Sequence, residues 1–144
     1  MDDLLIHMMR WGQQGYSCSQ ILLLMALEEK GQNNPDLVRA MAGLAFGCGS
    51  GRATCGSLTG GCCLLAFKAV DPDHSARSSE QLPMMLQELT EWFETRIGSF
   101  GEGAACSAIV GKGGPEMARQ TCAELVGETY AKVMAILAEY GVES

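Results

Sequence analysis

The sequence predicts an all-α protein: a single domain over residues 1–144, built as a bundle of five to six helices with two glycine-rich loops that carry cysteines. Three observations support this fold class. Apolar residues recur at helical spacing along most of the chain. No alternating apolar and polar run is long enough for a strand. The 144 residues, 47% of them hydrophobic, suit one hydrophobic core.

The first two helices are predicted from apolar periodicity and from the residues at their ends. Residues 2–11 form a short amphipathic pattern that Gly12 ends. Residues 17–31 carry a second pattern, with Ser17 as the expected N-cap and Gly31 as the expected C-cap.

The next two helices flank a glycine-rich loop. A helix is expected to begin at Asn34 and Pro35, which form a good N-cap and first-turn pair, and to continue to about Phe46. The loop leads into a fourth helix over residues 55–70. Glycines lower the helix propensity of this segment. We expect them to be present because another helix or a cofactor approaches the backbone closely at these positions. They are Gly56, Gly60 and Gly61.

The second half of the sequence predicts two longer helices. A polar linker covers residues 71–80, and a long amphipathic helix follows over residues 78–98. Residues 99–114 form a second glycine-rich segment. The last and longest helix is expected over residues 115–140, opened by a proline and closed by Gly141.

Cysteine usage points to chemistry. Four of the seven cysteines, together with six glycines, lie within residues 47–63. The count is odd and amounts to about 5% of the chain, below the ~8–10% typical of a disulfide scaffold. No pair has CxxC spacing, which excludes a zinc ribbon or a thioredoxin-type motif. In a reducing compartment such a set indicates metal binding or redox catalysis.

Four cysteines occupy suggestive positions. Cys18 lies in the first turn of the second helix, and Cys55 lies where the first loop enters the fourth. Cys106 lies in the second glycine-rich segment, and Cys122 lies near the start of the last helix. Helix N-termini favour thiolates. We expect these four side chains to converge, although free cysteines are also common as small buried hydrophobes.

The other residues of the first loop allow two interpretations. Cys63 and Cys62 fit a packing role better than a ligand role, and Cys48 fits both equally. Arg52 is either a solvated loop residue or a cofactor-binding residue that holds an anion or offsets thiolate charge.

The segments around the four cysteines resemble the C-GCAxxG-C-C family of bacterial proteins, which are described as redox-active. These segments are GYSCSQ, TCGSLTGG, AACSAIVG and QTCAELVGETYAKVMAIL, and their order and spacing cover nearly the whole chain. The Cys-Gly-x-x-x-Gly core matches at Cys55, Gly56 and Gly60, with Ser57 where the family usually has alanine. The resemblance implies four characteristic cysteines and a suspected iron–sulfur or other prosthetic group.

Composition limits the partners and the location. The net charge of −7 argues against nucleic acid and anionic membranes, and it favours a basic protein partner. The N-terminus opens with two acids and has no export signal. The apolar run over residues 21–27 is far shorter than the ~20 residues of a membrane span. The expectation is a cytoplasmic protein without membrane insertion.

The leading hypothesis is a redox protein in which Cys18, Cys55, Cys106 and Cys122 bind an iron–sulfur cluster and pass electrons to a partner oxidoreductase. The first alternative is a thiol–disulfide protein in which Cys55 attacks and one of the other three resolves. The second is a non-redox binding or assembly module. Broad apolar helix faces also predict a homodimer, built on the first helix, where Trp11 lies, or on the last.

Overall fold

The fold comes from a computed structural model that describes residues 3–74, 80–98 and 114–142. These ranges contain six α-helices of seven or more residues and no strand, which confirms the predicted all-α class. The second glycine-rich segment, residues 99–114, lies outside the described residues except for its last position. Cys106 therefore lies outside them as well.

The first two helices follow the sequence signals at their ends. α1 (Asp3–Gln13) runs slightly beyond its predicted end, and α2 (Cys18–Glu29) begins directly after Ser17. The backbone N–H of Ser17 donates a hydrogen bond to the side-chain oxygen of Gln20 at 3.1 Å, which fixes the start of α2. Beyond its end, Gly31 takes the left-handed conformation, with φ of +61°, as the sequence predicts.

The third helix is shorter than predicted. α3 (Pro35–Met41) starts as expected, because the side chain of Asn34 accepts the backbone N–H of Leu37 at 3.3 Å. The chain then tightens into a 3-10 turn over Ala42–Leu44. The prediction that one helix continues to Phe46 is therefore wrong, because the backbone there turns left-handed.

The turn after the 3-10 segment, α4 (Ala45–Cys48), is left-handed. Phe46 has φ of 55° and Cys48 has φ of 56°, and the glycines that follow each of them, Gly47 and Gly49, are left-handed too. The N–H of Gly49 closes the turn on the carbonyl of Ala45 at 2.8 Å. A left-handed conformation costs a non-glycine residue roughly 1–2 kcal/mol, so surrounding structure must hold this turn.

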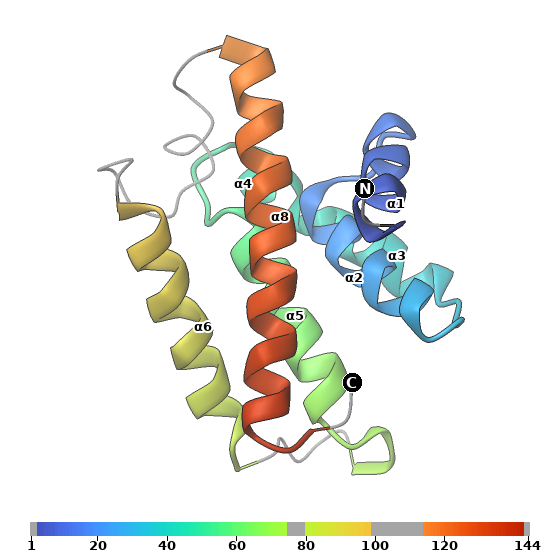
Figure 1. The fold of residues 1–144 in the computed structure, drawn as a ribbon, viewed down its shortest axis with the longest axis vertical. Coiled ribbons are helices and arrows are strands. Elements are labelled where there is room, and N and C mark those ends of the chain that lie inside the picture. Colours follow the sequence, from blue (N-terminus) through green and yellow to red (C-terminus); the bar gives the residue numbers. More distant parts are fainter. Residues whose placement is uncertain (1–2, 75–79, 99–113, 143–144) are drawn as a thin grey trace.

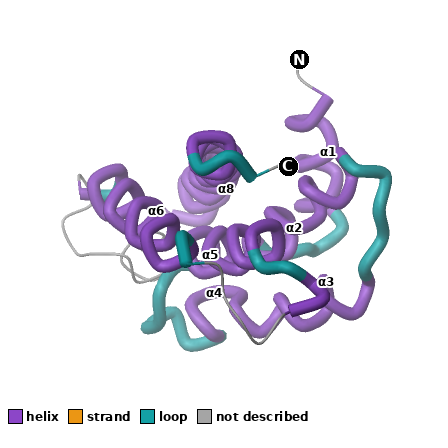
Figure 2. Tube along the Cα trace, turned by 90° about the horizontal axis from the view of Figure 1, so that it is seen from below, coloured by secondary structure: helices purple, strands orange, loops and turns teal. Residues whose placement is uncertain are grey.

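The central helix is α5 (Gly56–Ala69), which packs on α2, α6 (Leu82–Arg96) and α8 (Gly114–Glu139). α5 and α8 run in the same direction and α6 runs opposite to them (Figure 1). Figure 2 shows α6, α5 and α2 in a row, with α8 on one side of the row and α4 on the other. A short 3-10 turn, Pro72–His74, follows α5.

The core lies where these four helices meet. Leu22 of α2, Leu64 of α5, Phe93 of α6 and Ile136 of α8 are fully buried, and similar residues surround them. None of the helices in the described ranges has the length and unbroken apolar sequence needed to cross a bilayer.

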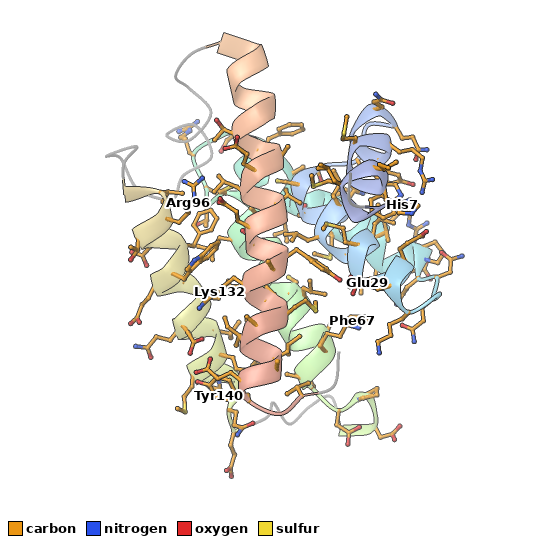
Figure 3. All side chains as sticks on the ribbon, viewed as in Figure 1. His7, Glu29, Phe67, Arg96, Lys132 and Tyr140 are labelled. Atoms are coloured by element: carbon orange, nitrogen blue, oxygen red, sulfur yellow. The ribbon has the colours of Figure 1, made fainter. Side chains whose placement is uncertain are left out.

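Ion pairs join α6 to α8 along their exposed edges. Arg96 approaches Glu128 at 2.7 Å, and Lys132 approaches Glu88 at 3.8 Å (Figure 3). Partly exposed pairs of this kind each stabilise a fold by about 1 kcal/mol or less. Their main effect is to fix the register between α6 and α8.

Trp11 does not lie on an exposed interface. Only 6% of the residue is exposed, and its ring stacks on His7 with centroids 5.6 Å apart. Trp11 therefore belongs to the core, and the expectation that it forms a dimer contact is wrong. Among the α1 side chains that the structure describes, Leu5, Ile6 and Met9 are the exposed large apolar ones, each at least 40% exposed.

We propose that the predicted self-association uses this exposed face of α1. Ile6→Glu should then reduce a dimer to a 15.3 kDa monomer, because a buried carboxylate in the contact would lose its hydration. Trp11→Glu should unfold the chain instead. Light scattering coupled to gel filtration measures the mass, and a native mass of 15.3 kDa at micromolar concentration would contradict the dimer.

Candidate functional site

The contact between α2 and α5 depends on two glycines. A Cβ atom on Gly60 would lie 2.9 Å from the Cα of Ser19, and a Cβ on Gly56 would lie 2.7 Å from the Sγ of Cys18. Real Cβ atoms do not approach other atoms this closely. The glycines therefore let the start of α2 rest directly on the backbone of α5, as the sequence predicts, and they seat the Cys18 sulfur there.

Gly61 serves the opposite side of α5. A Cβ atom at this position would lie 2.9 Å from Cγ2 of Thr129 on α8 and 3.1 Å from a methyl group of Leu89 on α6. The three glycines of α5 thus allow α2, α6 and α8 to pack closely against its backbone.

Ser19 ties the end of α3 to this contact. The residue is fully buried, and its hydroxyl donates a hydrogen bond to the carbonyl of Met41 at 2.9 Å. The carbonyl oxygen of Leu44 lies 3.1 Å from the Cβ position of Gly56. The segment that leads into the left-handed turn is therefore held against the first residue of α5.

Cys18 and Cys55 form a contacting pair at this end of the molecule. Cys18 is the first residue of α2, Cys55 is the N-cap of α5, and Cys55 is only 4% exposed. The hydrogen bond from the Cys18 thiol is the main reason that the pKa of Cys55 falls to about 6. The N–H and hydroxyl of Ser57 and the N–H of Leu58 lower this pKa further and, with Cys18, outweigh the opposing effect of burial.

The pKa of Cys18 is raised. Its proton is held in the hydrogen bond to Cys55, burial disfavours its charged form, and the negative charges of Cys55 and Cys122 add to both effects. These opposite shifts favour the thiolate form at Cys55 and the thiol form at Cys18.

Cys122 faces the same end from α8. It precedes Thr129 by seven residues, which is almost two full helical turns, so both side chains lie on one face of α8. Thr129 packs on Gly61. The charge of Cys122 also acts on the thiol of Cys18, so its side chain lies near the pair. The half-buried Cys122 is thus the third thiol at this site.

The structure brings three of the four expected cysteines to one end of the bundle, and Cys106 lies outside the described residues. Within the ranges that the structure describes, no group of three His, Cys, Asp or Glu side chains is arranged to hold a metal ion. The geometry among these residues is that of a thiol pair with a third thiol nearby.

The remaining cysteines within residues 47–63 lie elsewhere. Cys48 is exposed in the left-handed turn, and Cys63 is exposed on α5. Cys62 is half-buried, and burial raises its pKa. Arg52 is exposed three positions before Cys55, and its backbone N–H donates to the hydroxyl of Ser50 at 3.2 Å.

Sequence reasoning missed two serines that shape the thiol pair. Ser57 stabilises the Cys55 thiolate through both its N–H and its hydroxyl. Its position two residues after a helix-start cysteine was the available signal, because N–H groups there point to the N-cap side chain. Ser19 gave no comparable signal, because its partner, Met41, is distant in the sequence.

Comparison with known proteins supports a redox site. The family model described as "Putative redox-active protein (C_GCAxxG_C_C)" matches residues 16–136, a range that contains all seven cysteines. Searches of curated proteins and of solved structures found no significant match.

Proposed function

This chain belongs to the C_GCAxxG_C_C family, and we propose that its redox activity is thiol–disulfide exchange at Cys18 and Cys55. The contact between these two sulfurs is the observation that carries the proposal. One sulfur is a thiolate at neutral pH and its neighbour is a thiol, which are the two forms that successive exchange steps require.

The exchange takes two steps that balance in atoms and electrons. The Cys55 thiolate attacks one sulfur of a substrate disulfide R–S–S–R, forms a mixed disulfide and releases RS⁻. Cys18 then loses its proton to solvent, attacks the Cys55 sulfur and releases the second RS⁻. The protein pair gives up two electrons and becomes a disulfide, and the substrate becomes two thiols. A partner dithiol reverses both steps and restores the reduced pair.

The partner of this reaction is a redox protein, and the cytoplasm is the compartment we propose for it. A reducing compartment keeps cysteines as free thiols between turnovers. Because Cys55 is only 4% exposed, a substrate reaches its sulfur only when the residues that cover it shift.

Oxidation of the reduced protein by a small neutral disulfide should yield one intramolecular bond, between Cys18 and Cys55. Peptide mapping by mass spectrometry identifies the bond. Cys55→Ser should slow the consumption of the disulfide at least a hundredfold, because the reactive thiolate is lost.

Cys63→Ser is the matched control, because it removes an exposed thiol from α5 without touching the pair. It should leave both the bond and the rate unchanged. A stable bond between other cysteines, or a native pair that stays reduced under the same conditions, would disprove the exchange reaction.

An iron–sulfur cluster that passes electrons to a partner oxidoreductase is a second candidate, favoured by the third thiol at the site. Cys18, Cys55, Cys122 and Cys106 are the four cysteines expected to hold such a cluster, although the first three are not arranged to hold a metal ion in the described part of the structure. A bound cluster would supply one-electron chemistry. Iron and acid-labile sulfide in protein purified without oxygen, lost in Cys122→Ser but not in Cys63→Ser, would favour this candidate over exchange.

A further inference from the structure

Acidic residues are absent from the two segments that carry Cys18 and Cys55. Residues 4–27 and 37–70 contain no Asp or Glu, although the chain has 17 of them. The same two segments contain four basic residues: Arg10, Arg39, Arg52 and Lys68. The net charge of −7 is therefore carried by the rest of the chain, while Arg39 pairs with Asp36 and Lys68 lies at the far end of α5 from Cys55.

The left-handed turn presents an apolar ring and a cation in this carboxylate-free region. The Phe46 residue is 70% exposed, the largest exposure among the large hydrophobic residues of the described ranges. Arg52 is exposed in the loop that continues from the turn. The loop folds back on the turn, because the N–H of Gly51 donates to the carbonyl of Phe46 at 2.9 Å. Phe46 and Arg52 therefore belong to one compact loop.

Glu124 of α8 lies away from the face that carries Cys122. Glu124 lies two residues after Cys122, so its side chain is about 200° around α8 from the thiol face. α8 also lies on the opposite side of α5 from α4 (Figure 2). Phe46, Cys48 and Arg52 form what is here called the α4 surface, whose charged residue is Arg52.

We propose that the α4 surface is the docking site for an acidic, disulfide-bearing polypeptide, with Phe46 as the apolar anchor and Arg52 as the charged contact. The acidic character of this occupant is inferred from charge complementarity with Arg52. That it carries a disulfide rests on the proposed function. Docking here places a partner on the segment that leads directly to Cys55. An aromatic anchor beside an arginine is a common energetic centre of protein interfaces.

Two other occupants fit less well. A nucleic acid needs several phosphate contacts, and one exposed arginine in a chain of net charge −7 does not provide them. A second copy of this chain could offer its own acidic residues, but such a contact is head-to-tail and does not close into a dimer.

The test compares three synthetic seven-residue peptides, each oxidised to a disulfide-linked homodimer through a central cysteine and each containing one leucine. Their flanking residues are acidic, neutral or basic. We expect the reduced protein to react fastest with the acidic peptide at ~20 mM salt and to lose this preference at ~0.5 M salt. Peptide thiol released over time, measured by chromatography, gives the rate constants.

Arg52→Glu should slow the reaction with the acidic peptide about five- to tenfold at low salt. Lys30→Glu is the matched control, since it makes the same charge change at the far end of α2 and should alter the rate less than twofold. Phe46→Gly should slow the reaction with all three peptides at every salt concentration. Glycine tolerates the left-handed conformation, so this variant keeps the turn.

The outcomes separate the two proposals. If no peptide reacts, the exchange function is wrong. If all peptides react at equal rates, or if Lys30→Glu matches Arg52→Glu, exchange stands and the docking proposal is wrong. Stronger competition by a short DNA duplex than by the acidic peptide would overturn the polypeptide partner. So would self-association at low salt that Arg52→Glu abolishes, since a second copy would then be the occupant.

Discussion

Gly60→Ala is expected to lower the free energy of unfolding by about 2–3 kcal/mol. The added methyl group would lie 2.9 Å from the Cα of Ser19, and a backbone atom cannot move aside as the end of a side chain can. Relief requires α2 to shift away from α5, which also separates Cys18 from Cys55. Urea unfolding followed by circular dichroism measures the change through the midpoint concentration at constant slope.

Gly127→Ala supplies the matched control. Gly127 lies within α8 with no atom within 4 Å of its Cβ position, so alanine there should stabilise the helix by ~0.5–1 kcal/mol. Gly61→Ala should fall between the two, since its close neighbours are side-chain methyl groups. Equal effects at Gly60 and Gly127 would show that the contact between α2 and α5 is looser than described.

The thiolate of Cys55 should appear at unusually low pH. With a pKa of about 6 against a usual 9.0, roughly nine tenths of Cys55 is ionised at pH 7, compared with about one hundredth of an ordinary thiol. The thiolate forms as pH rises through the pKa. Absorbance near 240 nm should therefore show one thiolate with a midpoint near pH 6 that is lost in Cys55→Ser.

Cys18→Ala tests the cause of this shift. Removing the thiol that donates to Cys55 should raise the midpoint by at least one pH unit, because the Cys18 hydrogen bond is the largest contribution. Cys63→Ser should leave it in place. An unchanged midpoint in Cys18→Ala would show that the helix N-terminus, not the neighbouring thiol, stabilises the thiolate.

Local sequence signals predicted most of the helix ends. Ser17, Asn34 and Gly141 mark them in the structure as the sequence indicates, because capping depends on residues within four positions. The end of α3 at Met41 was not predictable. Nothing local distinguishes the residues after Met41 from a helix, and the contact of Leu44 with Gly56 arises only after α5 has packed.

The site was predictable in its parts but not in its pairing. Periodicity and helix starts identified Cys18, Cys55 and Cys122 as candidates. No sequence rule shows that Cys18, and not Cys122, is the direct hydrogen-bond partner of Cys55. That depends on the glycines at 56 and 60, which set how closely two helices approach.

The long separation of the paired cysteines in the sequence links the oxidation state of the protein to its folding stability. A bond between residues 18 and 55 would close a loop of roughly 40 residues, which lowers the entropy of the unfolded chain and stabilises the fold by about 4 kcal/mol in the chain-entropy model. By linkage, the folded state favours the disulfide form of Cys18 and Cys55. A mutation that loosens α2 from α5 removes part of this preference, so the reduced pair becomes a weaker reductant.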